Sequence, residues 1–242
     1  MSRKYPKPSL PPDQLTIAWQ SASLLMSYPD EALLGQLDMI RLASHKLPAV
    51  VGDSIREFVV HLSETPLAEL QVAYVETFDT RRRCNLFLTY FAHGDTRKRG
   101  MALLRFKQTY LRSGFVLADS GDSSELPDHL CVVLEYAATI DQRLGRGLIL
   151  DHRAGLELLR LSLRDSGSPW AAVIDAVTST LPPLRGDERD AVRRLAAEGP
   201  PEEEVGLAPF ATPEFSPGAA APVAAPTGVE LLPMPTFRGA RG

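Results

Sequence analysis

Residues 74–115 read YVETFDTRRRCNLFLTYFAHGDTRKRGMALLRFKQTYLRSGF, and this stretch indicates the fold class of the whole chain. Tyr74 and Phe78 are one helical turn apart, as are Phe106 and Tyr110. This spacing places apolar side chains on one face of a helix. Because apolar and polar residues do not alternate strictly over the length of a strand, the stretch favours helices.

The same helical spacing continues on both sides of this stretch. Further apolar stripes include Trp19, Leu33, Ile55, Leu130, Leu156 and Val173. A short charged segment at residues 188–197 is expected to form the last helix. The pattern predicts an all-α protein with roughly nine or ten helices in a single domain over residues 15–198.

Both ends of the chain are expected to lie outside this domain. Residues 199–242 hold nine of the chain's twenty prolines, many alanines and little apolar periodicity. Proline removes a backbone donor, and sparse apolar residues do not offset the entropy lost when a chain becomes ordered. The sequence therefore predicts a flexible Pro/Ala-rich tail over residues 199–242 and a disordered segment over residues 1–14.

Charge is distributed unevenly along the chain. Residues 74–115 contain nine Lys or Arg and three Asp or Glu, a local net charge of +6. Since the whole chain has a net charge of −4, the remaining residues carry −10. A molecule with its charges segregated in this way is suited to docking a partner.

Several further features indicate the compartment in which the protein works. The two cysteines, Cys84 and Cys131, show no metal-binding spacing, which is typical of a reducing compartment. The N-terminal residues lack the apolar core of a secretory signal. No run approaches the roughly 18 apolar residues that a membrane-spanning helix needs. We therefore expect a cytoplasmic protein without membrane insertion.

Sequence motifs of the common enzyme classes are absent. The chain contains no GxSxG, GxxxxGK[ST], HExxH or GxGxxG pattern. Its five histidines are scattered, with no i, i+4 pair to hold a metal on one helical face. We expect no enzyme activity, no catalytic residue, no metal site and no permanently bound cofactor.

Two basic clusters lie within the first stretch, at Arg81-Arg82-Arg83 and at Arg97-Lys98-Arg99. They form either a solvated basic surface or a site for an anion or a client protein, because guanidinium groups bind phosphates and carboxylates in a bidentate manner. Nucleic acid is disfavoured as a partner since the chain is acidic and lacks a broad basic face.

Acidic residues accompany the aromatic residues at the start of the stretch. Tyr74 and Phe78 form either a core face or an apolar contact for a peptide, and Glu76 and Asp79 lie close to them on the same helix. Charge-assisted hydrogen bonds from these carboxylates to arginine would hold a basic peptide.

A second segment, ELPDHLCVVLEYAA at residues 125–138, contains another polar group. Glu125 and Asp128 are suited to the N-terminus of a helix, where exposed N–H groups and the helix dipole favour acids. Together with His129 they also provide polar contacts for a bound peptide, and the histidine would make such a contact sensitive to pH.

Residues 74–115 and 125–138 together resemble the nitrate reductase molybdenum cofactor assembly chaperones, the NarJ branch of the TorD-like family. The resemblance implies a TorD-like helical fold with no enzymatic activity. It also implies binding to the immature catalytic (alpha) subunit of respiratory nitrate reductase through that subunit's N-terminal peptide. The chaperone would assist insertion of the molybdenum bis-guanine-dinucleotide cofactor into its client before the complex docks at the membrane.

In the wider family, a Glu-Pro-x-Asp-His motif helps to form the peptide site. The order here is Glu-Leu-Pro-Asp-His, so Asp128 and His129 match the motif while the proline comes one place later. We expect the client peptide to contact Tyr74, Glu76, Phe78, Asp79, Glu125, Asp128 and His129. We also expect Asp79→Ala and Asp128→Ala to weaken peptide binding and to leave thermal unfolding nearly unchanged.

Two other functions stay open at this point. A helical regulatory module would bind a small anionic ligand at the arginine clusters. A hydrolase with an unfamiliar site would use Asp128 and His129.

Overall fold

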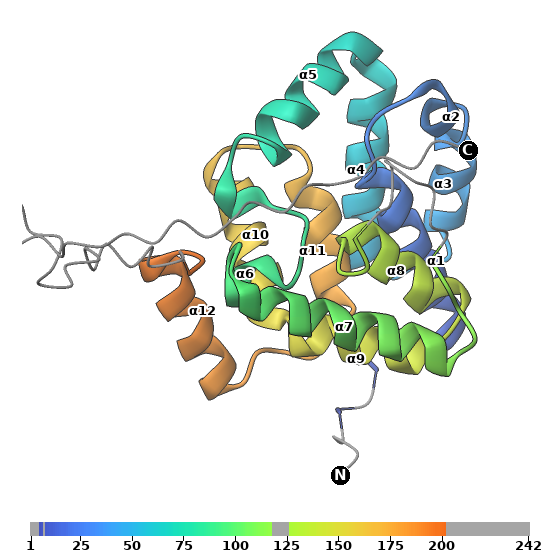
Figure 1. Ribbon diagram of the computed structural model, residues 1–242. Coiled ribbons are helices and arrows are strands. Elements are labelled where there is room, and N and C mark those ends of the chain that lie inside the picture. Colours follow the sequence, from blue (N-terminus) through green and yellow to red (C-terminus); the bar gives the residue numbers. More distant parts are fainter. Residues whose placement is uncertain (1–4, 7, 118–125, 202–242) are drawn as a thin grey trace, which may run out of the picture. The chain divides into compact units, whose positions relative to one another are not determined.

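The computed structural model describes residues 5, 6, 8–117 and 126–201, and within these ranges the chain is helical (Figure 1). Twelve α-helices and one 3-10 helix occur in the described residues, and no strand does. The elements are α1 (Pro12–Leu25), α2 (Glu31–Leu34), α3 (Leu37–Ser44), α4 (Ala49–Glu64), α5 (Leu67–Phe78), η1 (Arg82–Cys84), α6 (Tyr90–His93), α7 (Arg97–Arg112), α8 (Leu130–Thr139), α9 (Gln142–Asp151), α10 (Arg153–Asp165), α11 (Ala171–Ser179) and α12 (Gly186–Glu198). The all-α prediction is confirmed, whereas nine or ten helices was too few.

The core is built around α1 and α11. Helix α1 packs against α8 and α11, and α11 packs in turn against α4. Two tryptophans, Trp19 on α1 and Trp170 at the start of α11, are almost completely buried. The Trp19 indole Nε1 donates a hydrogen bond of 3.0 Å to Thr180 Oγ1, which satisfies its buried polar atom. These contacts join the first helix to residues far along the chain.

The second half of the body is formed by α9, α10 and α12. The apolar spacing of Leu148, Leu156 and Leu159 predicts a single helix, but the chain breaks at His152, where α9 ends and α10 begins. The Nδ1 atom of His152 lies 2.9 Å from the Leu148 carbonyl oxygen. Helix α10 then packs against both α11 and α12. The expected last helix is confirmed as α12.

The helix boundaries agree with some local predictions and not with others. Asp30 caps α2, because its carboxylate accepts a 2.8 Å hydrogen bond from the Leu33 N–H. Proline at position 127 predicts a helix start there, but α8 begins only at Leu130. Just before α8, the Asp128 carbonyl oxygen accepts a hydrogen bond from the Leu88 N–H.

The predicted N-terminal boundary of the helical domain lies close to the start of α1 at Pro12. Most of the predicted tail, residues 202–242, lies outside the described residues, as do residues 1–4 of the predicted N-terminal segment. None of the described helices combines the length and apolar composition needed to cross a bilayer.

Candidate functional site

Backbone contacts join the two segments singled out in the sequence, residues 74–115 and 125–138. Phe87 and His129 form an isolated antiparallel β-bridge. On one side of this bridge the Leu88 N–H donates to the Asp128 carbonyl oxygen at 3.0 Å, and on the other the Leu130 N–H donates to the Leu86 carbonyl oxygen at 2.8 Å. Residues 85–89 are therefore fixed against the start of α8 by backbone hydrogen bonds.

Asp128 reinforces this connection from inside the molecule. Its carboxylate is completely buried and accepts hydrogen bonds from both the N–H and the hydroxyl of Thr89. The Arg99 Nη2 atom lies 3.6 Å from the same carboxylate oxygen. The interpretation of Asp128 as a helix-capping acid is wrong, because α8 receives no side-chain capping bond and the carboxylate turns instead to Thr89.

His129 lies beside Phe87, with a distance of 5.1 Å between the ring centroids. Burial lowers the pKa of this histidine, and the nearby Asp128 carboxylate opposes that shift only in part. Glu125, the third residue predicted in this segment, lies outside the described residues. The buried Asp128 carboxylate holds residues 85–89 through Thr89, whereas the half-buried His129 contributes through its backbone bridge and its ring contact with Phe87.

The predicted aromatic pair on α5 faces the core. Tyr74 and Phe78 are both buried, with ring centroids 4.7 Å apart, and both pack edge-on against Trp170. The Tyr74 hydroxyl donates to the Met26 carbonyl oxygen at 3.1 Å. The sequence left open whether this face lies in the core or contacts a peptide, and the structure places it in the core.

Glu76 is exposed on the opposite face of α5, and Asp79, which was expected on the same helix, is the exposed C-cap residue that follows it. The structure therefore does not bring these two exposed carboxylates together with Asp128, which is buried. Binding of a peptide by Glu76 and Asp79 stays a prediction.

The arginine clusters also divide between the surface and the interior. Arg81, Arg83 and Arg97 are exposed. The Arg82 Nε atom donates to the Tyr90 hydroxyl at 2.8 Å. The Arg99 side chain is only 14% exposed; it pairs with Asp95 at 3.0 Å, donates to Thr89 and lies 5.2 Å from the Phe87 ring centroid. Since Arg99 points inward, its cluster does not present three guanidinium or ammonium groups to a single ligand.

Sequence reasoning missed the concave surface of the molecule. Two cavities, of about 380 and about 300 Å³, share Asp151, Ala154 and Ala191 in their lining. We call the two together the α10–α12 groove, because the start of α10 and one face of α12 line both of them. Neither cavity is lined by a side chain of the predicted peptide site.

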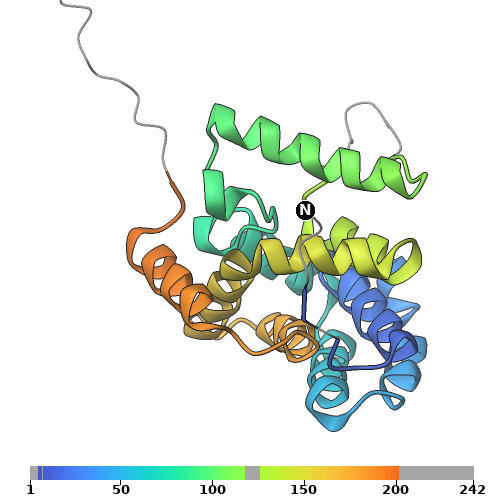
Figure 2. The same ribbon diagram turned by 90° about the horizontal axis from the view of Figure 1, so that it is seen from below.

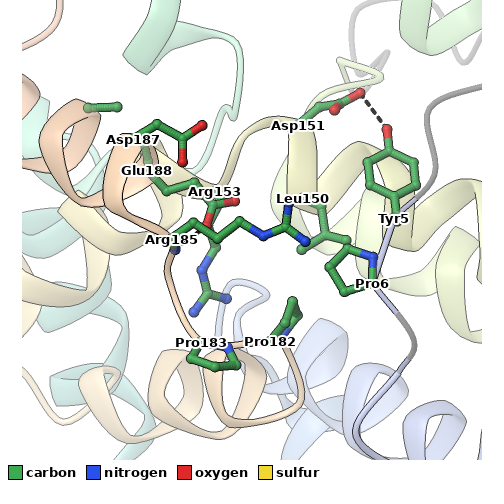
Figure 3. Close-up of a pocket in the computed structure, with 12 residues that line it drawn as sticks. Tyr5, Pro6, Leu150, Asp151, Arg153, Pro182, Pro183, Arg185, Asp187 and Glu188 are labelled. Atoms are coloured by element: carbon green, nitrogen blue, oxygen red, sulfur yellow. Dashed lines mark hydrogen bonds between the residues drawn. The ribbon is translucent and has the colours of Figure 1, made fainter.

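The first cavity of the groove is polar (Figure 3). Tyr5 donates a 2.9 Å hydrogen bond to Asp151 on one side, and Asp187 and Glu188 lie on the other. The Arg185 side chain extends between them toward Leu150 (Figure 3). Three carboxylates and two arginines thus line this cavity, so it carries a net negative charge.

Arg153 lines the same cavity and is 7% exposed. Its Nη2 atom lies 2.5 Å from Glu157 Oε1, while its Nε and Nη1 atoms have no hydrogen-bond partner among the described residues. Burial lowers the pKa of this guanidinium group, with the Glu157 charge opposing the shift. A buried donor without an acceptor is costly, and these two atoms carry that cost in the folded chain.

The second cavity of the groove is more apolar. Leu88 and Phe91 form one wall and Leu195 of α12 another, with Asp151 and Glu198 as its carboxylates. Gly155 allows the close approach of α10 to this wall, because a Cβ atom there would lie 2.7 Å from Phe91 side-chain atoms. This interior glycine in a helix is the one local signal in the sequence that points to close packing here.

The two parts of the site are connected through residues 85–91. The hydrogen bonds of Asp128 fix Leu88 and Thr89, and the turn that follows brings Phe91 to the groove. The predicted residue Asp128 therefore supports a wall of the groove from behind. The groove as a whole combines apolar walls with four carboxylates and three arginines, of which Arg185 and Arg194 are exposed and Arg153 is buried. Such a surface is suited to a peptide that carries both apolar and basic side chains.

Comparison with known proteins places these features in context. A family model described as nitrate reductase delta subunit matches residues 44–175, which include α5, the arginine clusters, Asp128 and the start of α10. The nitrate reductase-like protein NarX of Mycobacterium tuberculosis is 38% identical over 69% of this chain. That match covers 25% of NarX, so the chain spans about a quarter of the length of this relative.

Two shorter relatives match over more of their own length. NarJ of Bacillus subtilis is 31% identical to this chain, over 68% of the chain and 88% of that protein. NarJ of Escherichia coli K12, which is named a nitrate reductase molybdenum cofactor assembly chaperone, is 33% identical over 63% of the chain and 64% of that protein.

Proposed function

The chain belongs to the nitrate reductase delta subunit family, and from this membership we propose that it is a system-specific assembly chaperone for respiratory nitrate reductase. It binds the immature catalytic subunit through that subunit's N-terminal peptide. It assists insertion of the molybdenum bis-guanine-dinucleotide cofactor before the complex docks at the membrane. It works in the cytoplasm as a binding protein and not as an enzyme.

The observation that carries this proposal is the similarity to relatives that bear the chaperone name, at 31–33% identity. The α10–α12 groove is the surface to which we assign binding of the client peptide. A client peptide with apolar anchors fits against Leu88, Phe91 and Leu195, and its basic side chains lie near Asp151 and Glu198. The buried donors of Arg153 would reach a backbone carbonyl of the same peptide once the guanidinium group moves toward the cavity.

The strength expected of this interaction is moderate. Burial of roughly 300–400 Å² of apolar surface stabilises a complex by about 8–10 kcal/mol before losses are counted. The loss of translational and rotational freedom then removes several kcal/mol, and charge-assisted hydrogen bonds restore part of it. The balance corresponds to a dissociation constant on the order of 1 μM. A complex of this strength forms readily and also releases its client after assembly.

The residues predicted from the sequence take different roles in this proposal. Asp128 and His129 act indirectly, because they hold residues 85–89 and through them the wall at Leu88. Tyr74 and Phe78 attach α5 to the core through their buried rings. Glu76 and Asp79 remain direct candidates at the outer face of α5, where they would meet basic residues of the client beyond the groove.

Co-expression tests this function. The catalytic subunit of nitrate reductase is produced with and without this chain, and its molybdenum content is measured after purification. We expect molybdenum in the client to fall severalfold or more when the chain is omitted. Equal molybdenum content in the two preparations would contradict the proposed function.

A further inference from the structure

Helix α7 carries three exposed apolar side chains on its outer face. Only Ala102, Phe106 and Tyr110 are buried, so the helix contacts the body through one narrow stripe. Figure 2 shows α7 along one edge of the helical body, with its opposite face turned outward. On that face Met101 and Leu111 are 65% and 60% exposed.

Leu104 lies between them on the same face and is 44% exposed. At 100° per residue, Met101, Leu104 and Leu111 fall within one stripe directly opposite Phe106. Single exposed apolar residues are normal on a protein surface, but three on one face of one helix mark a contact surface. Among the described residues, none covers this stripe enough to bury it.

The same helix is strongly basic. Its sixteen residues include six Lys or Arg and no Asp or Glu, in a chain with a net charge of −4. Lys98, Arg105, Lys107 and Arg112 are exposed and form no ion pair within the described part of the chain. Lys98, Arg105 and Arg112 flank the apolar stripe on one side, and Lys107 flanks it on the other.

We infer that the outer face of α7 is a peripheral docking surface for a bilayer that contains anionic phospholipid. An apolar stripe bordered by cations is the pattern with which an amphipathic helix lies in a membrane interface. The apolar side chains enter the boundary between headgroups and acyl chains. The long Lys and Arg side chains keep their charges at the level of the phosphates.

A bilayer fits this face better than an acidic groove on another protein. The exposed Gln108 lies in the middle of the stripe, between the apolar residues. In a closed protein groove this amide would need a dedicated partner. The hydrated headgroup region satisfies it without such a partner, while the anionic lipids match the net positive charge of the helix.

The structure also allows docking without rearrangement. Arg99 turns inward to Asp95 and Asp128, and Tyr110 donates to the Pro127 carbonyl oxygen, so the inner side of α7 stays attached to the body. The surface is separate from the α10–α12 groove, since no residue of α7 lines either cavity. The inference therefore does not depend on where the client peptide binds.

Vesicle flotation with the full chain tests this inference. The probes are vesicles of pure phosphatidylcholine and vesicles with about 30% phosphatidylglycerol, at about 0.1 M and about 0.5 M salt. We expect partitioning onto the anionic vesicles at low salt, at least tenfold weaker binding at high salt, and little binding to pure phosphatidylcholine.

A charge variant and a matched control identify the surface. Each Lys or Arg near an anionic bilayer raises the partition coefficient by about fivefold, so Arg105→Gln with Lys107→Gln and Arg112→Gln lowers it by about a hundredfold. The control Lys46→Gln with Arg189→Gln and Arg193→Gln makes the same change in net charge at exposed positions outside α7, one after α3 and two on α12. We expect this control to bind much more tightly than the α7 variant.

An apolar pair provides the second test. Met101→Ser with Leu111→Ser is expected to lower partitioning at least tenfold. Met39→Ser with Leu42→Ser on α3 changes residues of the same types that are 59% and 72% exposed, and it leaves partitioning unchanged. Because all these side chains are exposed, thermal unfolding should be the same for each variant. The inference would be overturned if the wild-type protein did not bind anionic vesicles. It would also be overturned if the α7 variants bound as tightly as their controls.

Discussion

Removal of the Asp128 carboxylate tests the structural account of the Asp-His segment. Asp128→Ala takes away the acceptor for the Thr89 N–H and the Thr89 hydroxyl, which lie in the interior. It also removes a counter-charge 3.6 Å from Arg99, whose side chain is 14% exposed. The variant should therefore be less stable than the wild-type protein. The expectation from sequence was the opposite, that Asp128→Ala leaves stability nearly unchanged.

The magnitude follows from these contacts. Breaking a buried charge pair by removal of one partner costs about 3–5 kcal/mol, because the other partner stays buried without compensation. Arg99 retains Asp95 at 3.0 Å, so we expect the lower part of this range, about 3–4 kcal/mol. Asp128→Asn keeps the shape and an acceptor for Thr89, and its cost should be roughly half as large.

Urea unfolding followed by far-ultraviolet circular dichroism measures the change in the free energy of unfolding. Asp79→Ala is the matched control, since Asp79 is exposed and its removal should change the free energy by less than about 0.5 kcal/mol. If Asp128→Ala lost less than about 1 kcal/mol, the carboxylate would not hold residues 85–89 as described.

Three further predictions concern stability. Phe78→Ala should lower the free energy of unfolding by about 3–5 kcal/mol in urea titrations, because its ring packs between Tyr74 and Trp170; a loss below about 1 kcal/mol would place Phe78 outside the core. Glu157→Gln should lower the thermal midpoint by several degrees or more, because Glu157 neutralises the buried Arg153, and an unchanged midpoint would rule out that role. Burial lowers the pKa of His129 and of His152, so below about pH 6.5 the unfolded chain binds protons that the folded chain does not. Stability should then fall with decreasing pH by up to about 1.4 kcal/mol per unit for each histidine, and a slope that persists in a His129→Gln, His152→Gln double variant would refute this origin.

The sequence was informative about helices because their main signal is local. Apolar spacing located α5 and α7, and the capping role of Asp30 depends only on a residue three positions away. The same spacing does not reveal what a helical face contacts. Tyr74 and Phe78 were therefore compatible with a core face or a peptide contact, and only the position of Trp170 decides between them.

The candidate site was less accessible to sequence reasoning because it depends on long-range contacts. The partner of the Asp128 carboxylate is Thr89, thirty-nine positions earlier in the chain. The α10–α12 groove joins Leu88 and Phe91 to the start of α10 and to one face of α12. No local pattern predicts that these elements meet, although Gly155 within a helix indicates close packing at that point.

Calorimetric titration with a synthetic N-terminal peptide of the nitrate reductase catalytic subunit tests the central claim most directly. Ala191→Trp fills the part of the groove common to both cavities, whereas Ala197→Trp makes the same change on α12 at an exposed position that lines neither cavity. We expect wild-type protein and Ala197→Trp to bind the peptide with a dissociation constant on the order of 1 μM, and Ala191→Trp to bind at least tenfold more weakly. Equal binding by all three proteins, or no heat from the wild-type protein, would contradict the account.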